Sequence, residues 1–174
     1  MPVPTTGAGT SGFGVSIPTK GPDFAPHNMT GYALPAPYVA LGSGEFFPFY
    51  CYTAFDGLVS ATHYWLVNST AGWLRLDIGA GNAKVLYSYA VRVNSIPEPN
   101  RAPKDWTLKA SNNGVDFDTL DTVTGQTGWG SGESREFVCD VIVSAYRYFR
   151  IDITVNNGDA SFTQVAEMYL YEAV

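Results

Sequence analysis

A single carboxylate interrupts the apolar segment QVAEMYLYE at residues 164–172, close to the end of the chain. Glu167 lies between Ala166 and Met168, and most of its other neighbours are large and hydrophobic. Burying an ionised carboxylate in such a strand is costly unless hydrogen-bond donors or an opposite charge compensate it. We therefore expect Glu167 to have a defined partner elsewhere in the chain.

Residues typical of a catalytic centre are sparse. The chain contains two histidines, His27 and His63, and neither belongs to an HExxH motif. No GxSxG motif is present, and no nucleophile is paired with a recognisable general base. The aspartates and glutamates form no recognisable acid–base motif. The sequence thus predicts a protein that is not an enzyme.

Charge and composition restrict the possible partners. The 174 residues carry a net charge of −6, and only 15% of them are charged, whereas 14% are aromatic. Because no Lys/Arg cluster occurs along the chain, we expect neither nucleic acid nor an anionic membrane as a partner. No apolar run approaches the about 20 residues that a membrane-spanning helix needs. The N-terminus lacks the features of a signal peptide, which predicts a protein that is not exported by a cleaved signal.

The two cysteines, Cys51 and Cys139, are far apart in the sequence and belong to no CxxC motif. They could form one disulfide bridge or remain buried as free thiols, and their spacing does not decide between these alternatives. Isolated cysteines of this kind are more often buried thiols, which favours the second alternative.

Short segments with strand-like patterns follow one another from residue 38 onward. In WLRLDIG, hydrophobic and other residues alternate, which places Leu74, Leu76 and Ile78 on one face. Stretches such as SNNGVD and NNGDAS are typical of tight turns. Neither an internal repeat nor a βαβ alternation is present, so the pattern predicts an all-β antiparallel sandwich or barrel. Further β-type segments lie at 85–94, 105–111, 135–143, 146–155 and 164–172.

The N-terminal part of the chain has a different composition. Residues 1–37 hold 7 of the 11 prolines and 6 of the 18 glycines, which do not form regular helix or sheet by themselves. One interpretation is a disordered leader. The other is an extended arm that becomes ordered on another subunit, with apolar residues such as Phe13 and Phe24 as anchors. The spaced apolar residues favour the extended arm, followed by a globular domain at 38–174.

The order of several motifs in this domain resembles a known family. AFDG (54–57) precedes YW (64–65), GWLRLDIG (72–79) and RAPKDWTLKASNNGVDFDTLD (101–121), and AYRYFRIDIT and QVAEMYLYE complete the series. The series resembles the discoidin, or coagulation-factor type C, domain and the related galactose-binding carbohydrate modules, over about residues 37–171. The resemblance implies an antiparallel β-sandwich with a jelly-roll arrangement, which binds ligands on loops at one end. The RAPKDWTL, TGQTGW and YRYFRI segments are most similar to versions in virion proteins of tailed phages.

Many members of this family carry a structural calcium ion, and the resemblance implies Asp56, Glu167 and, more weakly, Thr62 as its ligands. Calcium binds about six to eight oxygen atoms, from carboxylates and backbone carbonyls. The segment DGLVSATHYW is longer than the family pattern, with Leu58 and Val59 where an asparagine is common. The alternative is a metal-free site in which Glu167 accepts hydrogen bonds from backbone amides near Asp56. Either arrangement would tie the last strand to the first loop.

Four loops are expected at the ligand-binding end, at 44–52, 58–64, 95–101 and 127–133. Sugars are held by stacking on aromatic rings and by a few directed polar groups. The candidate ligand-binding residues are Phe47, Tyr50, His63, Arg101, Trp129 and Glu133. Each also has a structural interpretation, as a residue that orders its loop or packs on a neighbour. The aromatic segment at 46–50 could equally form a contact between subunits.

These features favour a non-enzymatic virion protein of a tailed phage, assembled in the host cytoplasm. The arm would anchor it to other virion proteins, and the discoidin-like domain would bind a glycan or another feature of the host surface. One alternative is a capsid or tail decoration protein that cements the particle and binds no sugar. Another is a carbohydrate-binding module of a secreted bacterial protein. We expect a homo-oligomer, because arms of this kind usually become ordered on a symmetric neighbour.

Overall fold

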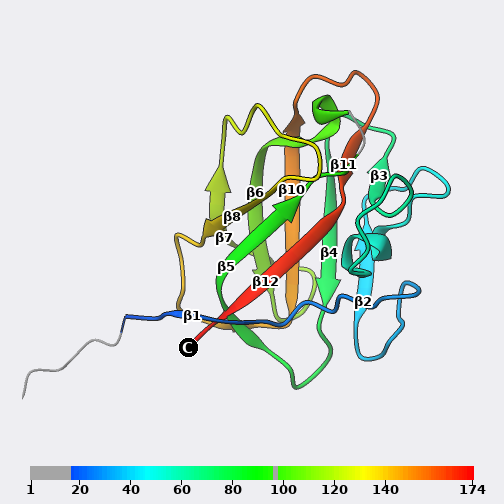
Figure 1. Cartoon of the computed structure of the whole chain (residues 1–174). Coiled ribbons are helices and arrows are strands. Elements are labelled where there is room, and N and C mark those ends of the chain that lie inside the picture. The colour runs from blue at the N-terminus through cyan, green and yellow to red at the C-terminus, as the bar shows by residue number, and fades with distance from the viewer. Residues whose placement is uncertain (1–16, 96–97) are drawn as a thin grey trace, which may run out of the picture.

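Two antiparallel β-sheets pack face to face in the computed structural model, which describes residues 17–95 and 98–174 (Figure 1). The predicted all-β sandwich is therefore confirmed. The first sheet has the strand order β1-β12-β5-β8, with the short β9 also paired to β5. Its strands are β1 (Lys20–Asp23), β5 (Lys84–Arg92), β8 (Ser134–Val138), β9 (Ala145–Tyr146) and β12 (Glu167–Ala173).

The second sheet has the order β2-β4-β10-β6-β7. Its strands are β2 (Val39–Gly42), β4 (Gly72–Asp77), β6 (Pro103–Ser111), β7 (Asp118–Val123) and β10 (Tyr148–Asn156). A small third pair joins β3 (Trp65–Val67) to β11 (Thr163–Val165). Two short 3-10 helices, η1 (Cys51–Phe55) and η2 (Pro99–Arg101), lie in the connections.

The core lies between the two sheets and is built from alternating residues of each strand. Leu74, Leu76 and Ile78 are buried, as the sequence alternation predicts, and Phe149 of β10 is buried with them. Two polar aromatic side chains also lie in the core. The Trp106 indole donates to the Tyr89 hydroxyl (2.8 Å), which donates to the Asp121 carboxylate (2.7 Å). This chain of hydrogen bonds satisfies polar groups that would otherwise be costly to bury.

The domain begins earlier than the expected boundary at residue 37. Strand β1 pairs with β12, with Lys20 opposite Ala173, and Met29 is buried in the core. The sequence did not indicate β1 because its KGPD segment has no apolar alternation, and its pairing depends on a partner strand at the other end of the chain. Residues 1–16 of the expected arm, including Phe13, lie outside the described residues.

Cys51 and Cys139 are buried free thiols, so the second of the two alternatives for the cysteines applies. Burial raises the pKa of the Cys139 thiol to about 12 and also raises the pKa of Cys51. Both side chains therefore act as small apolar core residues. In the part of the chain that the structure describes, no helix is long and apolar enough to cross a membrane.

Candidate ligand-binding site

Glu167, at the start of β12, is fully buried and has two partners. Its Oε1 accepts a hydrogen bond from the Gly57 amide (2.5 Å), and its Oε2 faces Nδ1 of His27 (3.2 Å). The other ring nitrogen of His27 lies 2.7 Å from Oδ2 of Asp23 in β1. The imidazole thus bridges carboxylates of the first and last strands. We refer to His27, Asp23, Glu167 and the Gly57 amide as the latch.

The latch favours a charged imidazole. Burial lowers the pKa of His27, but its hydrogen bonds to Asp23 and Glu167 and their negative charges outweigh this effect, and the pKa rises to about 9. Burial raises the pKa of Glu167, against the lowering effects of His27 and the Gly57 amide. The partner that Glu167 requires is therefore an internal cation.

The residues that the resemblance assigns to calcium do not fit a calcium site. Glu167 faces nitrogen atoms with both oxygens, and so does Asp56: Oδ1 accepts the Leu58 amide (2.8 Å) and Oδ2 lies 2.7 Å from Nδ1 of His63. Thr62 instead contacts Ser60 within its own turn. Among the described residues, no group of three or more His, Cys, Asp or Glu side chains could hold a metal ion. The geometry corresponds to the metal-free alternative, with His27 as an added partner.

Four aromatic side chains gather on the surface beside η1: Tyr32, Phe47, Tyr50 and Tyr52, hereafter the aromatic cluster. The rings of Tyr50 and Tyr52 are stacked with centroids 5.5 Å apart, and Tyr32 meets Tyr52 edge-on at 5.4 Å. Phe47 is 78% exposed, so the cluster reaches solvent. The Glu45 carboxylate accepts hydrogen bonds from the Tyr32 hydroxyl and the backbone amide of the first residue of η1 (2.6 Å each), which fixes the cluster on its loop.

A cavity of about 430 Å³ adjoins the aromatic cluster through Tyr52. The contact between His63 and Asp56 orients the imidazole in its wall, and the His63 side chain is 38% exposed. With Nδ1 engaged by the carboxylate, the other ring nitrogen is free to bond a ligand hydroxyl. The cavity is lined by His27, Asn28, Met29, Thr30, Tyr52, Thr53, Asp56, Leu58 and His63. It thus combines an aromatic ring with directed polar groups, as sugar sites do.

The structure brings together only three of the six candidate ligand residues. Phe47 and Tyr50 belong to the aromatic cluster, and His63 lines the cavity beside it. Tyr32 and Tyr52 were missed by the sequence analysis. Tyr52 is two residues from Tyr50 in the segment YCY, which is a signal that could have identified it.

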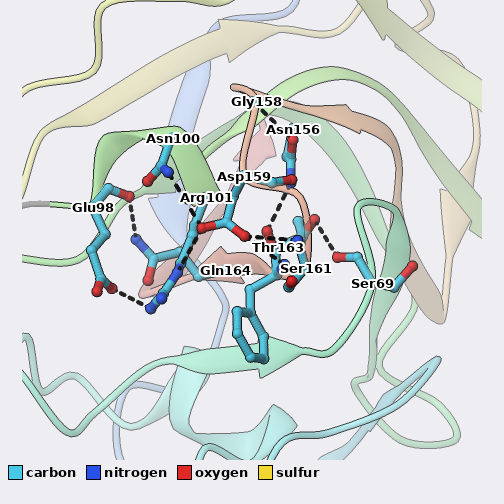
Figure 2. A network of polar contacts seen from close by, with 11 residues as sticks. Ser69, Glu98, Asn100, Arg101, Asn156, Gly158, Asp159, Ser161, Thr163 and Gln164 are labelled. Carbon is cyan, nitrogen blue, oxygen red and sulfur yellow. Dashed lines mark hydrogen bonds and ion pairs between the residues drawn. The ribbon is translucent and has the colours of Figure 1, made fainter.

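Arg101 belongs to a different network, at the loop between β10 and β11 (Figure 2). Its guanidinium forms ion pairs with Glu98 and with Asp159 (3.1 Å). Asp159 also accepts hydrogen bonds from the backbone amides of Ser161 and Phe162, and the Phe162 ring lies 4.9 Å from the Arg101 guanidinium. These contacts tie η2 to the β10–β11 loop. They support the interpretation of Arg101 as a residue that orders its loop.

Trp129 and Glu133 also have structural partners. Trp129 is only 5% exposed, and its indole donates to the Pro103 carbonyl (2.9 Å). The Arg135 guanidinium lies over the Trp129 ring, 4.1 Å from its centroid, and its Nε forms an ion pair with Oε1 of Glu133 (2.6 Å). Glu133 further accepts the Gly130 amide. This arrangement leaves little of the indole face for a sugar.

Solved structures of carbohydrate-binding modules and of F5/8 type C domains share this fold. A family 32 carbohydrate-binding module from Clostridium perfringens NanJ, in complex with galactose, has a TM-score of 0.62 and 19% identity, covering 78% of this chain and 93% of that one. An F5/8 type C domain from Bacteroides fragilis has a TM-score of 0.65 and 16% identity, covering 79% and 92%. A chitosan-binding module from Paenibacillus sp. IK-5 has a TM-score of 0.61 and 18% identity, covering 86% and 98%.

The chain therefore has the discoidin-like β-sandwich fold that these modules share. No protein-family model and no curated protein matches the sequence. At identities below 20%, the likeness to these three structures concerns the fold and not individual ligand contacts.

Proposed function

We propose that the protein is a non-enzymatic carbohydrate-binding module that holds a glycan at the aromatic cluster and the adjoining cavity. The observation that carries this proposal is that Tyr52 of the aromatic cluster and the oriented His63–Asp56 pair line one cavity. A pyranose ring would stack on Tyr52, and the free ring nitrogen of His63 would bond one of its hydroxyl groups.

The contacts of His63 favour binding over catalysis. Its ring is oriented by Asp56, but no serine, threonine or cysteine side chain of the described residues hydrogen-bonds to it. The ring is therefore paired with no side-chain nucleophile, and its other nitrogen can direct a ligand hydroxyl group. Several solved structures with the same fold are carbohydrate-binding modules, which supports the same conclusion.

A glycan array followed by calorimetric titration of the best binder tests this proposal. Tyr52→Ala and His63→Gln should each weaken binding about tenfold or more, because each removes a contact that the sugar cannot replace. Tyr87→Ala, which changes a tyrosine of β5 outside the cavity, should bind as the wild type does. A Tyr52→Ala variant that is folded and binds with unchanged affinity would refute the site.

We also propose that the module serves a tailed-phage virion and contacts the host surface. The resemblance of the RAPKDWTL, TGQTGW and YRYFRI segments to phage virion proteins supports this setting, and residues 1–37 would supply the contact with other virion proteins. A truncation that removes residues 1–16 keeps every described strand. Its incorporation into particles should fall sharply, and normal incorporation would contradict anchoring by this segment. A blank glycan array together with normal incorporation would instead favour a decoration protein.

A further inference from the structure

Three cationic side chains lie in a row across the outward face of the second sheet. In this sheet the central strand β10 lies between β4 and β6 (Figure 1). Arg150 of β10 is directly opposite Arg75 of β4 on one side and Lys109 of β6 on the other. The next residues of these strands, such as Ile151 and Leu108, are buried in the core, so the three cations share the opposite face. We refer to Arg75, Arg150 and Lys109 as the cation row.

The cation row carries an excess of positive charge. Asp152 is its ion-pair partner, lying 2.8 Å from Nζ of Lys109 and accepting a hydrogen bond from Arg150 at 2.9 Å. Within the described residues, Arg75 forms no ion pair; its Nη1 donates to the Gly114 carbonyl (3.3 Å), and its Nε is buried without a hydrogen-bond partner.

Asp77 lies on the same face of β4, close enough to Arg75 to interact with it, and pairs with Arg147 (2.6 Å). With that pair included, four cations share two carboxylates, in a protein whose net charge is −6. Like charges directly opposite one another destabilise a sheet, and an anion bound across them would relieve that repulsion.

Aromatic rings hold the guanidinium groups in place. The Arg75 guanidinium lies 5.4 Å from the centroid of Tyr148, and the Arg150 guanidinium lies 4.1 Å from that of Phe117 and 5.7 Å from that of Trp73. Stacking of this kind orients the planar groups and reduces the entropy lost when they bind a ligand. It also covers ring faces on which nucleobases would otherwise stack.

We propose that the cation row is a second saccharide site, which takes an acidic saccharide carrying carboxylate or sulfate groups. Guanidinium groups bind such oxyanions through paired hydrogen bonds. Neighbouring strands lie about 5 Å apart, so the three charges span about 10 Å, enough for a short segment of a charged oligosaccharide. The covered rings and the negative net charge disfavour a nucleic acid. The site does not depend on the proposed glycan cavity, since none of the three cations lines that cavity.

The test is a titration of the full chain with a sulfated, heparin-derived octasaccharide and with a uronate octamer, using a neutral chitin hexamer as control. We expect at least one acidic oligosaccharide to bind, and its affinity to fall as sodium chloride is raised. The double variant Arg75→Gln/Lys109→Gln should lose about tenfold or more in affinity. Lys104→Gln changes a lysine that lies in β6, as Lys109 does, but outside the cation row, and this variant should bind the acidic oligosaccharide as the wild type does.

Three results would overturn the proposal. The first is an absence of binding by both acidic oligosaccharides at low salt. The second is an affinity that the double variant leaves unchanged while its thermal unfolding shows that it is folded. The third is equal or tighter binding of a single-stranded oligonucleotide of matched charge, which would assign the face to nucleic acid. Tyr52→Ala should leave the acidic saccharide bound, which separates this site from the proposed cavity.

Discussion

Replacement of His27 by glutamine should remove the positive charge from the latch while keeping a side chain of similar reach. The pKa of His27 is about 9 in the folded protein and about 6.5 in an unfolded chain. The contribution to stability is therefore fully present below pH 6.5 and is lost as the pH rises through 9. A difference of about 2.5 pKa units corresponds to about 3 kcal/mol.

The expected results differ with pH. At pH 6, His27→Gln should lower the free energy of unfolding by about 3 kcal/mol, or the melting temperature by about 6 to 12 °C for a chain of this size. The loss is of this order because Glu167 stays buried without its cation. Above pH 9.5 the variant and the wild type should have nearly the same stability, because the wild-type imidazole is then mostly neutral too.

Urea unfolding followed by tryptophan fluorescence at pH 6, 7.5 and 9.5 measures this effect. His63→Gln removes the other histidine and is the matched control: it should retain the decline in stability between pH 6.5 and 9, whereas His27→Gln should lose it. The physical account of the latch would be refuted if His27→Gln showed the same pH profile as the wild type. It would also fail if wild-type stability rose across this range.

Other parts of the structure lead to three further outcomes. Gly57→Ala should lower the free energy of unfolding by about 2 kcal/mol or more, because Gly57 has φ +75° and an added Cβ would lie 2.5 Å from the His27 carbonyl oxygen. Gly81→Ala, at φ +82° with open space around the added Cβ, should lower it less, and equal losses would contradict this account. The melting temperature should be the same in EDTA and in millimolar calcium, and a calcium-dependent rise of several degrees would restore the metal site. Cys51 and Cys139 should react with a thiol reagent only after unfolding, so immediate reaction of the folded protein would argue against their burial.

Much of the sandwich could be predicted from local patterns. The alternation of WLRLDIG placed Leu74 and Leu76 in the core, because a strand with one buried face imposes that period on its own sequence. Strand β1 could not be predicted in this way, because it is short, contains Pro22 and forms its hydrogen bonds with β12. The pairing of β1 depends on the position of the last strand, β12, and no pattern within the β1 sequence indicates that position.

The candidate site was predicted only in part, for a related reason. Phe47 and Tyr50 belong to one segment, and their aromatic character was enough to predict them as ligand-binding residues. His27 was missed because its partner Glu167 is 140 residues away, and no local pattern relates the two. The cation row was missed because Arg75 and its companions are isolated in the sequence and become neighbours only through strand register.

The pairing of β1 with β12 has a mechanical consequence. Thr19 and Val174 exchange two backbone hydrogen bonds, of 2.9 and 3.0 Å, so the chain enters and leaves the domain at one point. A force that separates these two ends loads the bonds of β1 one after another, as in a zipper, and β1 should peel away at low force. Peeling then reaches Asp23, the last residue of β1, and His27, whose contact with Glu167 of β12 resists further opening. The latch would act as a mechanical stop when the protein is pulled by its N-terminal segment.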